Sequence, residues 1–291
     1  MIAASQKDAA MTAVLNPAID HVVIHVGPEL DAAAAQYQRL GFQLTERGHH
    51  SLGSSNNLAI FGTDYLELLG YEPGRASPRA ELWQMPNGLG GLVFKPPGDA
   101  GFRDRVVAAG VPAGESREFN RPVSLPDGTA PEAHFRVTHL DGSVAFGGRV
   151  FFCHHVTPEL VWRPEWQRQP NGVTAIAEFG IVSADPDKAV EPYRKLFGAA
   201  AVQPVEGGQA IVTPQARVLV LQPEAARAIW GDALPPLPAD GADMMVALTF
   251  RADLAAARQA LTEGGVPFTE VSGRLLVAAA ETSGLAIAFA A

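Results

Sequence analysis

The sequence has few of the features that mark secreted, membrane-embedded or nucleic-acid-binding proteins. Its single cysteine, Cys153, cannot form an internal disulfide, which suits a reducing cytoplasm. No segment approaches the roughly 18 consecutive apolar residues of a membrane helix. The 22 basic residues, against 31 acidic ones, form no dense run, and the net charge is −9. We therefore expect a cytoplasmic protein that binds neither nucleic acid nor a membrane.

Several short catalytic and targeting motifs are also missing. There is no P-loop, no dinucleotide-type glycine fingerprint after the first predicted strand, and no G-x-S-x-G elbow. The N-terminal residues lack an apolar stretch behind a basic start, so they do not resemble a signal peptide. We expect residues 1–15 to form a flexible tail. The rest of the chain, with 47% hydrophobic residues overall, can bury the core of one large or two ordinary domains.

An internal repeat decides the fold prediction. Segment 19–26 predicts a strand, the Ala-rich segment 30–40 an amphipathic helix that Gly41 ends, and segments 42–47, 57–61 and 64–69 three more strands. The same order returns three times. The later units open with strands at 91–95, 174–183 and 244–251, and their helices at 102–109, 186–197 and 254–263 end at Gly110, Gly198 and Gly264 with Gly265. Four helices that stop at glycines in register indicate a repeated βαβββ unit.

Proline-rich segments separate these units. Residues 163–172, R-P-E-W-Q-R-Q-P-N-G, form the strongest boundary. We therefore expect one domain over residues 16–163, a linker over 164–172 and a second domain over 173–291. Segments 72–86 and 222–243 are expected to be linkers between the two units of each half.

Several short motifs lie in the first half of the chain: I-D-H-V-V-I-H-V around His21, L-G-F after the first helix and D-Y-L-E-L-L-G around Glu67. H-S-L-G-S-S-N follows from His50, and F-F-C-H-H-V-T-P-E-L-V-W precedes a later P-N-G. With these motifs the sequence resembles the glyoxalase-like members of the vicinal oxygen chelate superfamily. The resemblance implies an α+β fold in which four βαβββ modules form two glyoxalase-like domains with cupped mixed sheets. It also implies a divalent metal at the floor of a cup, but not one particular reaction.

His21 and Glu67 are the candidate metal ligands of the first domain. Imidazole nitrogen and carboxylate oxygen suit Zn, Fe, Mn, Ni or Co, and the sequence does not choose among these ions. Alternation in segment 64–69 places Tyr65, Glu67 and Leu69 on one face, where a buried carboxylate needs a partner. A solvent-facing Glu67 is the competing interpretation. The resemblance implies that His21 is the partner, and Glu67 is also our candidate for the catalytic base.

The third metal ligand is expected from the doublet His154–His155. Adjacent strand residues point to opposite faces, so only one of the two can enter the pocket. Register against the Glu67 strand favours His154, whereas the similarity of the H-V-T-P-E-L-V-W run to glyoxalase-like relatives favours His155, which we choose. His50 and Asn56 are expected to line the pocket mouth and bind the substrate.

The second half of the chain does not repeat these candidate ligands. Glu178 takes the position of His21, and the last strand of the same unit, R-V-L-V-L-Q, contains no acidic residue. The fourth unit has neither His nor Glu in its first and last strands. We therefore expect the second domain to be a degenerate, structural copy.

Three functions are compatible with these residues. The first is a metal-dependent isomerase or lyase that acts on a small oxygenated organic substrate and stabilises an enolate-like oxyanion. The second is an Fe(II) extradiol-type dioxygenase. Gly91 counts against it, because that group takes both histidines from first strands and Gly91 aligns with His21. The third is a non-catalytic protein that sequesters a small molecule. A homodimer is the one protein partner that the sequence suggests.

Overall fold

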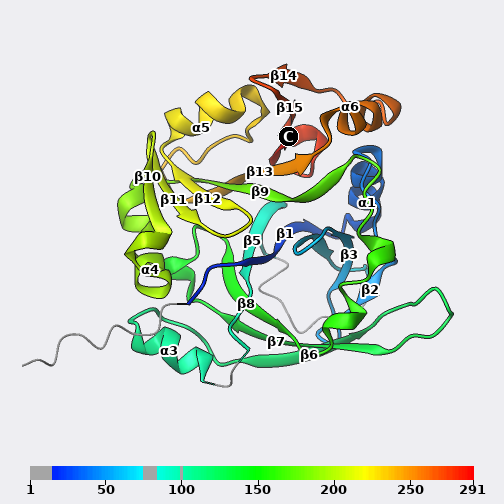
Figure 1. The fold of residues 1–291 in the computed structure, drawn as a ribbon, viewed down its shortest axis with the longest axis horizontal. Coiled ribbons are helices and arrows are strands. Elements are labelled where there is room, and N and C mark those ends of the chain that lie inside the picture. Colours follow the sequence, from blue (N-terminus) through cyan, green and yellow to red (C-terminus); the bar gives the residue numbers. More distant parts are fainter. Residues whose placement is uncertain (1–14, 75–83, 99–100) are drawn as a thin grey trace, which may run out of the picture.

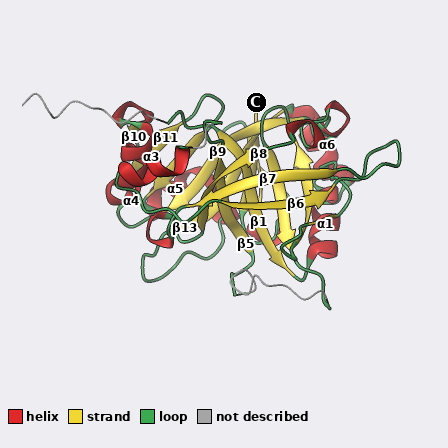
Figure 2. Ribbon diagram, turned by 90° about the horizontal axis from the view of Figure 1, so that it is seen from below, coloured by secondary structure: helices red, strands yellow, loops and turns green. Residues whose placement is uncertain are grey.

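Two eight-stranded mixed sheets, each bordered by helices, form the protein. The computed structural model describes residues 15–74, 84–98 and 101–291. The strand orders are β2-β3-β4-β1-β5-β8-β7-β6 and β10-β11-β12-β9-β13-β16-β15-β14, so the same arrangement occurs twice. Figure 1 shows the first sheet below the second, and Figure 2 shows the strands in the middle with helices toward two ends. The predicted α+β fold of repeated βαβββ modules is confirmed.

The first sheet belongs to residues 19–155 and is built from two modules. The first module contains β1 (Ile19–Gly27), α1 (Leu30–Arg39), β2 (Gly48–His49), β3 (Ser55–Ile60) and β4 (Tyr65–Gly70). The second contains β5 (Gly88–Phe94), α3 (Phe102–Ala108), β6 (Arg117–Pro122), β7 (Glu132–His139) and β8 (Arg149–His155). The modules join where β1 pairs with β5 in antiparallel orientation.

The second sheet repeats this plan over residues 173–290. Its first module contains β9 (Val173–Val182), α4 (Pro186–Phe197), β10 (Val202–Val205), β11 (Gly208–Val212) and β12 (Arg217–Leu221). After α5 (Pro223–Trp230), the second module contains β13 (Met244–Ala252), α6 (Leu254–Glu263), β14 (Thr269–Val271), β15 (Arg274–Val277) and β16 (Ala286–Ala290). Antiparallel pairing of β9 with β13 joins the two modules.

One glycine at the end of each of the four helices adopts the backbone conformation that this role requires, whereas Gly264, predicted with Gly265, keeps a helical φ of −73°. Gly41, Gly110, Gly198 and Gly265 have φ angles of 80°, 77°, 82° and 62°. Residues with a side chain rarely adopt positive φ, so glycine ends each helix and redirects the chain toward the next strand. This shared device is why the repeat is visible in the sequence.

Two predicted segments differ in the structure. Residues 42–47 were expected to be a strand, but no strand forms there and β2 is confined to Gly48–His49. Phe42 is buried in the core, and only isolated hydrogen bonds, such as that from the Thr45 amide to the Leu58 carbonyl, join the segment to β3. The predicted linker 222–243 contains the helix α5, which opens with Pro223 and buries the side chain of Trp230 completely. Proline at the first helical position is a start signal that the linker interpretation overlooked.

The two halves share one hydrophobic core. Phe42, from the first half, packs with its ring centroid 5.3 Å from that of Phe250, on β13. The Tyr37 hydroxyl donates to the carbonyl of Thr282, and the amide of Ile176 donates to the Asp64 carboxylate at 2.9 Å. These contacts bury the convex side of the first sheet, which leaves its concave side available for a site. The expected tail 1–15 lies almost wholly outside the described residues.

None of the helices in the described part of the chain has the length and apolar character needed to cross a membrane.

Candidate active site

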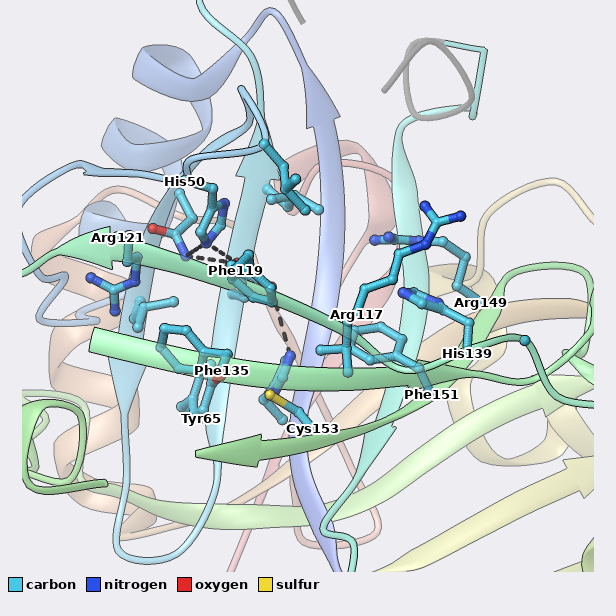
Figure 3. Close-up of a pocket in the computed structure, with 18 of the residues that line it drawn as sticks. His50, Tyr65, Arg117, Phe119, Arg121, Phe135, His139, Arg149, Phe151 and Cys153 are labelled. Carbon is cyan, nitrogen blue, oxygen red and sulfur yellow. Dashed lines mark hydrogen bonds and ion pairs between the residues drawn. The ribbon is translucent and has the colours of Figure 1, made fainter. Parts of the chain in front are cut away.

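The concave face of the first sheet holds a cavity of about 440 Å³. Its lining includes His21 from β1, Glu67 from β4, and side chains of β3, β6, β7 and β8 (Figure 3). Strand alternation explains the lining, because Tyr65, Glu67 and Leu69 all face the cavity, as the period of two requires. The cavity size is that of a small organic ligand.

His21 and Glu67 meet inside this cavity. His21 Nε2 lies 3.7 Å from Glu67 Oε2, and the two residues are only 3% and 7% exposed. Burial alone would raise the pKa of the Glu67 carboxyl. His21, His50 and the Asn56 amide outweigh burial and hold the pKa below its usual value. Glu67 is therefore an ionised carboxylate at neutral pH, buried but well partnered.

His50 and Asn56, the predicted substrate-binding residues, lie beside Glu67 on the cavity wall. Asn56 Nδ2 donates to Glu67 Oε1 at 2.7 Å and lies 3.2 Å from His50 Nε2. His50 Nε2 is 3.9 Å from the same carboxylate oxygen, and its Nδ1 is 2.8 Å from the Ser54 hydroxyl. One histidine thus lies beside each oxygen of Glu67, although the ligand atoms of these three residues do not all come within 4.8 Å of one another.

Asp20 is a site residue that the sequence reasoning did not single out. It is 1% exposed, and its Oδ1 lies 2.7 Å from His21 Nδ1. A register shift between Ile19 and His21 in the pairing with β5 leaves Asp20 at a bulge, beside the His21 ring. Burial would raise the Asp20 pKa, but His155 and His21 more than offset it and the pKa is strongly lowered. The acidic residue directly before His21 was the available signal.

His155, the predicted third metal ligand, contacts Asp20 rather than Glu67. It lies on the cavity side of β8, in alternation with Phe151 and Cys153, whereas His154 lines a separate small pocket on the opposite side. His155 Nε2 lies 2.9 Å from Asp20 Oδ1, and neighbouring rings enclose the imidazole. His155 is not part of the cavity lining. The structure therefore does not gather His21, Glu67 and His155 into one compact set of ligands; Asp20 stands between the two histidines.

A second group of potential ligand atoms lies at the wall of the cavity, where Cys153 forms part of the lining. Among the described residues, Asp20, Cys153 and His155 form the one group of three such side chains whose ligand atoms all lie within 4.8 Å of one another. Burial first, and then the carboxylates of Asp20 and Glu67, raise the pKa of the Cys153 thiol well above its usual value. Without an ion, Cys153 is thus a protonated, buried side chain.

In the second sheet, the position equivalent to His21 carries a structural ion cluster. Glu178 pairs with Arg217 on β12 and Thr249 on β13, as His21 pairs with Tyr65 and Val93. Arg217 and Arg274 bind the Glu178 carboxylate at 2.5 and 2.7 Å. Both oxygens of the Glu178 carboxylate are thus paired with guanidinium groups. This half of the chain has no counterpart of the His21–Glu67 pair.

Comparisons with known proteins agree with this architecture. A triple mutant of 4-hydroxymandelate synthase from Streptomyces coelicolor superposes with a TM-score of 0.59 at 12% identity, over 95% of this chain and 92% of that one. A hypothetical protein from Staphylococcus aureus gives 0.65 at 10% identity, over 95% and 99%. A fusion of a xylose isomerase-like TIM barrel and 4-hydroxyphenylpyruvate dioxygenase gives 0.54 at 13%, over 96% of this chain and 50% of that longer one. Identities this low show the fold alone.

Sequence comparison identifies the family. No curated protein matches the chain. The family model of the glyoxalase-like domain matches residues 19–197, which cover the first sheet and the opening strand and helix of the second. Together with the two cupped sheets and the paired modules, this match places the protein in the vicinal oxygen chelate superfamily, as a member of the glyoxalase-like domain family.

Proposed function

We propose that the protein is a metal-dependent enzyme that isomerises or cleaves a small oxygenated organic substrate in the cavity of the first domain. One observation carries the proposal. His21 Nε2 and Glu67 Oε2 face the cavity 3.7 Å apart, close enough for one divalent ion to contact both at ordinary bond lengths of about 2.0–2.2 Å. We assign the catalytic role to residues 16–163 and a structural role to 173–291.

The donor atoms around the cavity fit a divalent metal. Asp20 occupies Nδ1 of His21, which leaves Nε2 free to act as a ligand and fixes the ring orientation, as carboxylates behind metal-bound histidines commonly do. His50 Nε2, on the other side of Glu67, supplies the third donor. Two histidines and one carboxylate form a set that leaves coordination positions open. We propose His50 rather than His155 as the third ligand, because His50 lines the cavity whereas Asp20 holds the Nε2 atom of His155.

A bound ion would supply Lewis-acid stabilisation to an oxyanion that develops on the substrate. The chain itself supplies orientation and a proton acceptor. Asn56 holds one oxygen of Glu67, so the other oxygen is fixed toward His21 and the cavity. Because its pKa is lowered, the Glu67 carboxylate is ionised and can accept a proton from a substrate carbon. The apolar walls limit the water that competes for it.

Metal analysis of purified variants tests the proposal. We expect stoichiometric divalent metal in the wild type and its loss in His21→Ala, Glu67→Ala and His50→Ala. A metal bound by Asp20, Cys153 and His155 would give a different pattern of metal loss. Cys153→Ala removes one ligand of that group but none of the proposed cavity ligands. Metal retained in Cys153→Ala and lost in the other three supports the cavity site. Equal metal in all proteins would sink the proposal, because the ion would then bind away from these residues. No metal in the wild type would also sink it and would favour a metal-free, sequestering protein.

An Fe(II)-dependent oxygenase is the second candidate. Two observations favour it: the structural neighbours include a dioxygenase fusion protein, and two histidines with one carboxylate are a common ligand set for Fe(II) in oxygenases. The identity of the bound metal separates the two candidates. Iron together with oxygen consumption on aromatic diols or 2-oxo acids would select the oxygenase. Zinc, nickel, cobalt or manganese without oxygen consumption would select the isomerase or lyase.

A further inference from the structure

We propose that the ligand of this cavity is a small organic acid with an apolar or aromatic body, whose anionic group binds at Arg117, Arg149 and His139. The inference deepens the proposed function, because it concerns the same cavity, but it rests on different residues. Figure 3 shows these three side chains together at one end of the pocket, apart from His50. All three belong to the cavity lining.

The basic end is built around one aromatic ring. The Arg149 guanidinium lies 5.6 Å from the centroid of the Phe151 ring, and the His139 ring lies 4.5 Å from the same ring. Cross-strand pairing of His139 with Phe151 fixes this arrangement within the sheet. Arg117 comes from the outermost strand, β6, and faces the cavity beside them. Three different strands therefore direct basic side chains to one place.

The charge of the cavity opposes that of the whole chain. The protein carries a net charge of −9, yet three arginines line this one cavity, the third being the buried Arg121. Among the residues that the structure describes, two carboxylates share the lining, Glu115 and Glu67. Glu115 is engaged by Arg103 at 2.7 Å, a residue that does not line the cavity. Positive charge concentrated in a concave, partly desolvated site attracts anionic ligands.

The basic end and the His21–Glu67 pair belong to one cavity of about 440 Å³. A ligand anchored at Arg149 therefore does not need to be long to reach Glu67 and His21. Guanidinium groups bind carboxylates through parallel hydrogen bonds, so they would orient the ligand as well as attract it.

Apolar side chains fill the walls between these polar groups. Phe119 and Phe135 stack with their centroids 5.0 Å apart across β6 and β7, and both line the cavity with Phe151. Leu58, Leu69 and Val137 complete this surface. A ligand that matches the cavity thus has an apolar body and a terminal anionic group. A neutral sugar would offer the basic end no anionic group.

Binding of a matched acid and amide tests this inference. Phenylacetate and phenylacetamide have the same ring and nearly the same shape, but only the acid is charged at neutral pH. Both are titrated, by NMR or calorimetry, into chelator-treated wild type and into Arg117→Gln, Arg149→Gln and Arg136→Gln. Arg136 is a matched control because it lies on β7, binds Glu118 at 2.8 Å, and does not line the cavity. Thermal melting of each variant verifies its folding, and Arg117 is exposed, so its replacement spares the core.

We expect wild type and Arg136→Gln to bind the acid at least about tenfold more tightly than the amide, as a charge-assisted hydrogen bond allows. In Arg117→Gln and Arg149→Gln that preference falls toward unity. Equal affinity for acid and amide, no detectable binding of the acid, or an unchanged preference in both cavity variants would overturn the inference. Because the titration is made without metal, its result is independent of the metal analysis. Either proposal can therefore fail while the other stands.

Discussion

Asp20 Oδ1 lies 2.9 Å from Nε2 of His155, a residue 135 positions away in the sequence, and this contact is almost completely buried. The same oxygen lies 2.7 Å from His21 Nδ1. One carboxylate oxygen therefore connects the last strand of the second module to the first strand of the first module. The contact holds His155, the predicted third metal ligand, beside Asp20 and outside the cavity lining.

Removing the Asp20 carboxylate should destabilise the protein. Asp20→Ala leaves two buried imidazole nitrogens without their acceptor, and such a loss costs about 3 kcal/mol. Asp20→Asn retains one acceptor oxygen of the same shape and should cost less. Urea unfolding of the two variants beside wild type measures this order. Equal stability of Asp20→Ala and wild type would show that the contact contributes nothing to the fold.

His155→Gln separates a supporting role from metal ligation. If His155 acts through Asp20, glutamine can still donate a hydrogen bond to that carboxylate, and we expect metal content to stay within a few-fold of wild type. If His155 is itself a ligand, metal should be lost to the same extent as in His21→Ala. Metal analysis of the two variants, purified side by side, decides between these roles.

The overall architecture followed from local signals in the sequence. Gly41 and Gly110 end helices at positive φ because few other residues adopt that conformation, and alternation around Glu67 gave the correct inward face. Residues 42–47 failed as a strand because burial of Phe42 in the shared core, rather than ladder pairing, fixes that segment. Local pattern predicts which residues are buried, but not which partner buries them.

The site could be predicted from the sequence less completely than the fold, for a physical reason. The approach of Asp20 to His155 depends on a bulge in β1 and on the twist that brings β8 alongside, and neither is encoded in a short motif. The basic end of the cavity draws on three strands, β6, β7 and β8. Arg117 and Arg149 are 32 positions apart and carry no recognisable spacing, so only the assembled sheet shows that they belong together.

The Glu178 cluster should stabilise the second domain without serving the cavity. Glu178→Ala leaves Arg217 and Arg274 facing each other without their shared carboxylate. Because both arginines are partly exposed, water screens them, and we expect a loss of about 2 kcal/mol rather than the full cost of a buried pair. Thermal or urea unfolding measures it. Metal content and acid binding should not change, and a parallel loss of either would assign the second domain a direct role in the site.

Asp64 should make stability depend on pH between about 4 and 6. Burial raises its pKa from 3.8 to about 6, a shift that the Ile176 amide and Lys95 reduce and Asp20 reinforces. The folded protein therefore keeps a proton that the unfolded chain releases, so this group makes stability fall as pH rises through that window. Below pH 4 both states are protonated, and above pH 6 both are ionised, so the contribution is constant there.

Asp64→Asn tests this dependence, because the amide oxygen can still accept the hydrogen bond from Ile176 but cannot ionise. Its stability relative to wild type should rise by up to about 3 kcal/mol between pH 4 and pH 7, as a shift of two pKa units implies. Asp104→Asn, at an exposed carboxylate of α3, is the control and should show little change across the same range. Urea unfolding at several pH values measures both differences. A constant difference between Asp64→Asn and wild type would mean that Asp64 titrates normally in the folded protein.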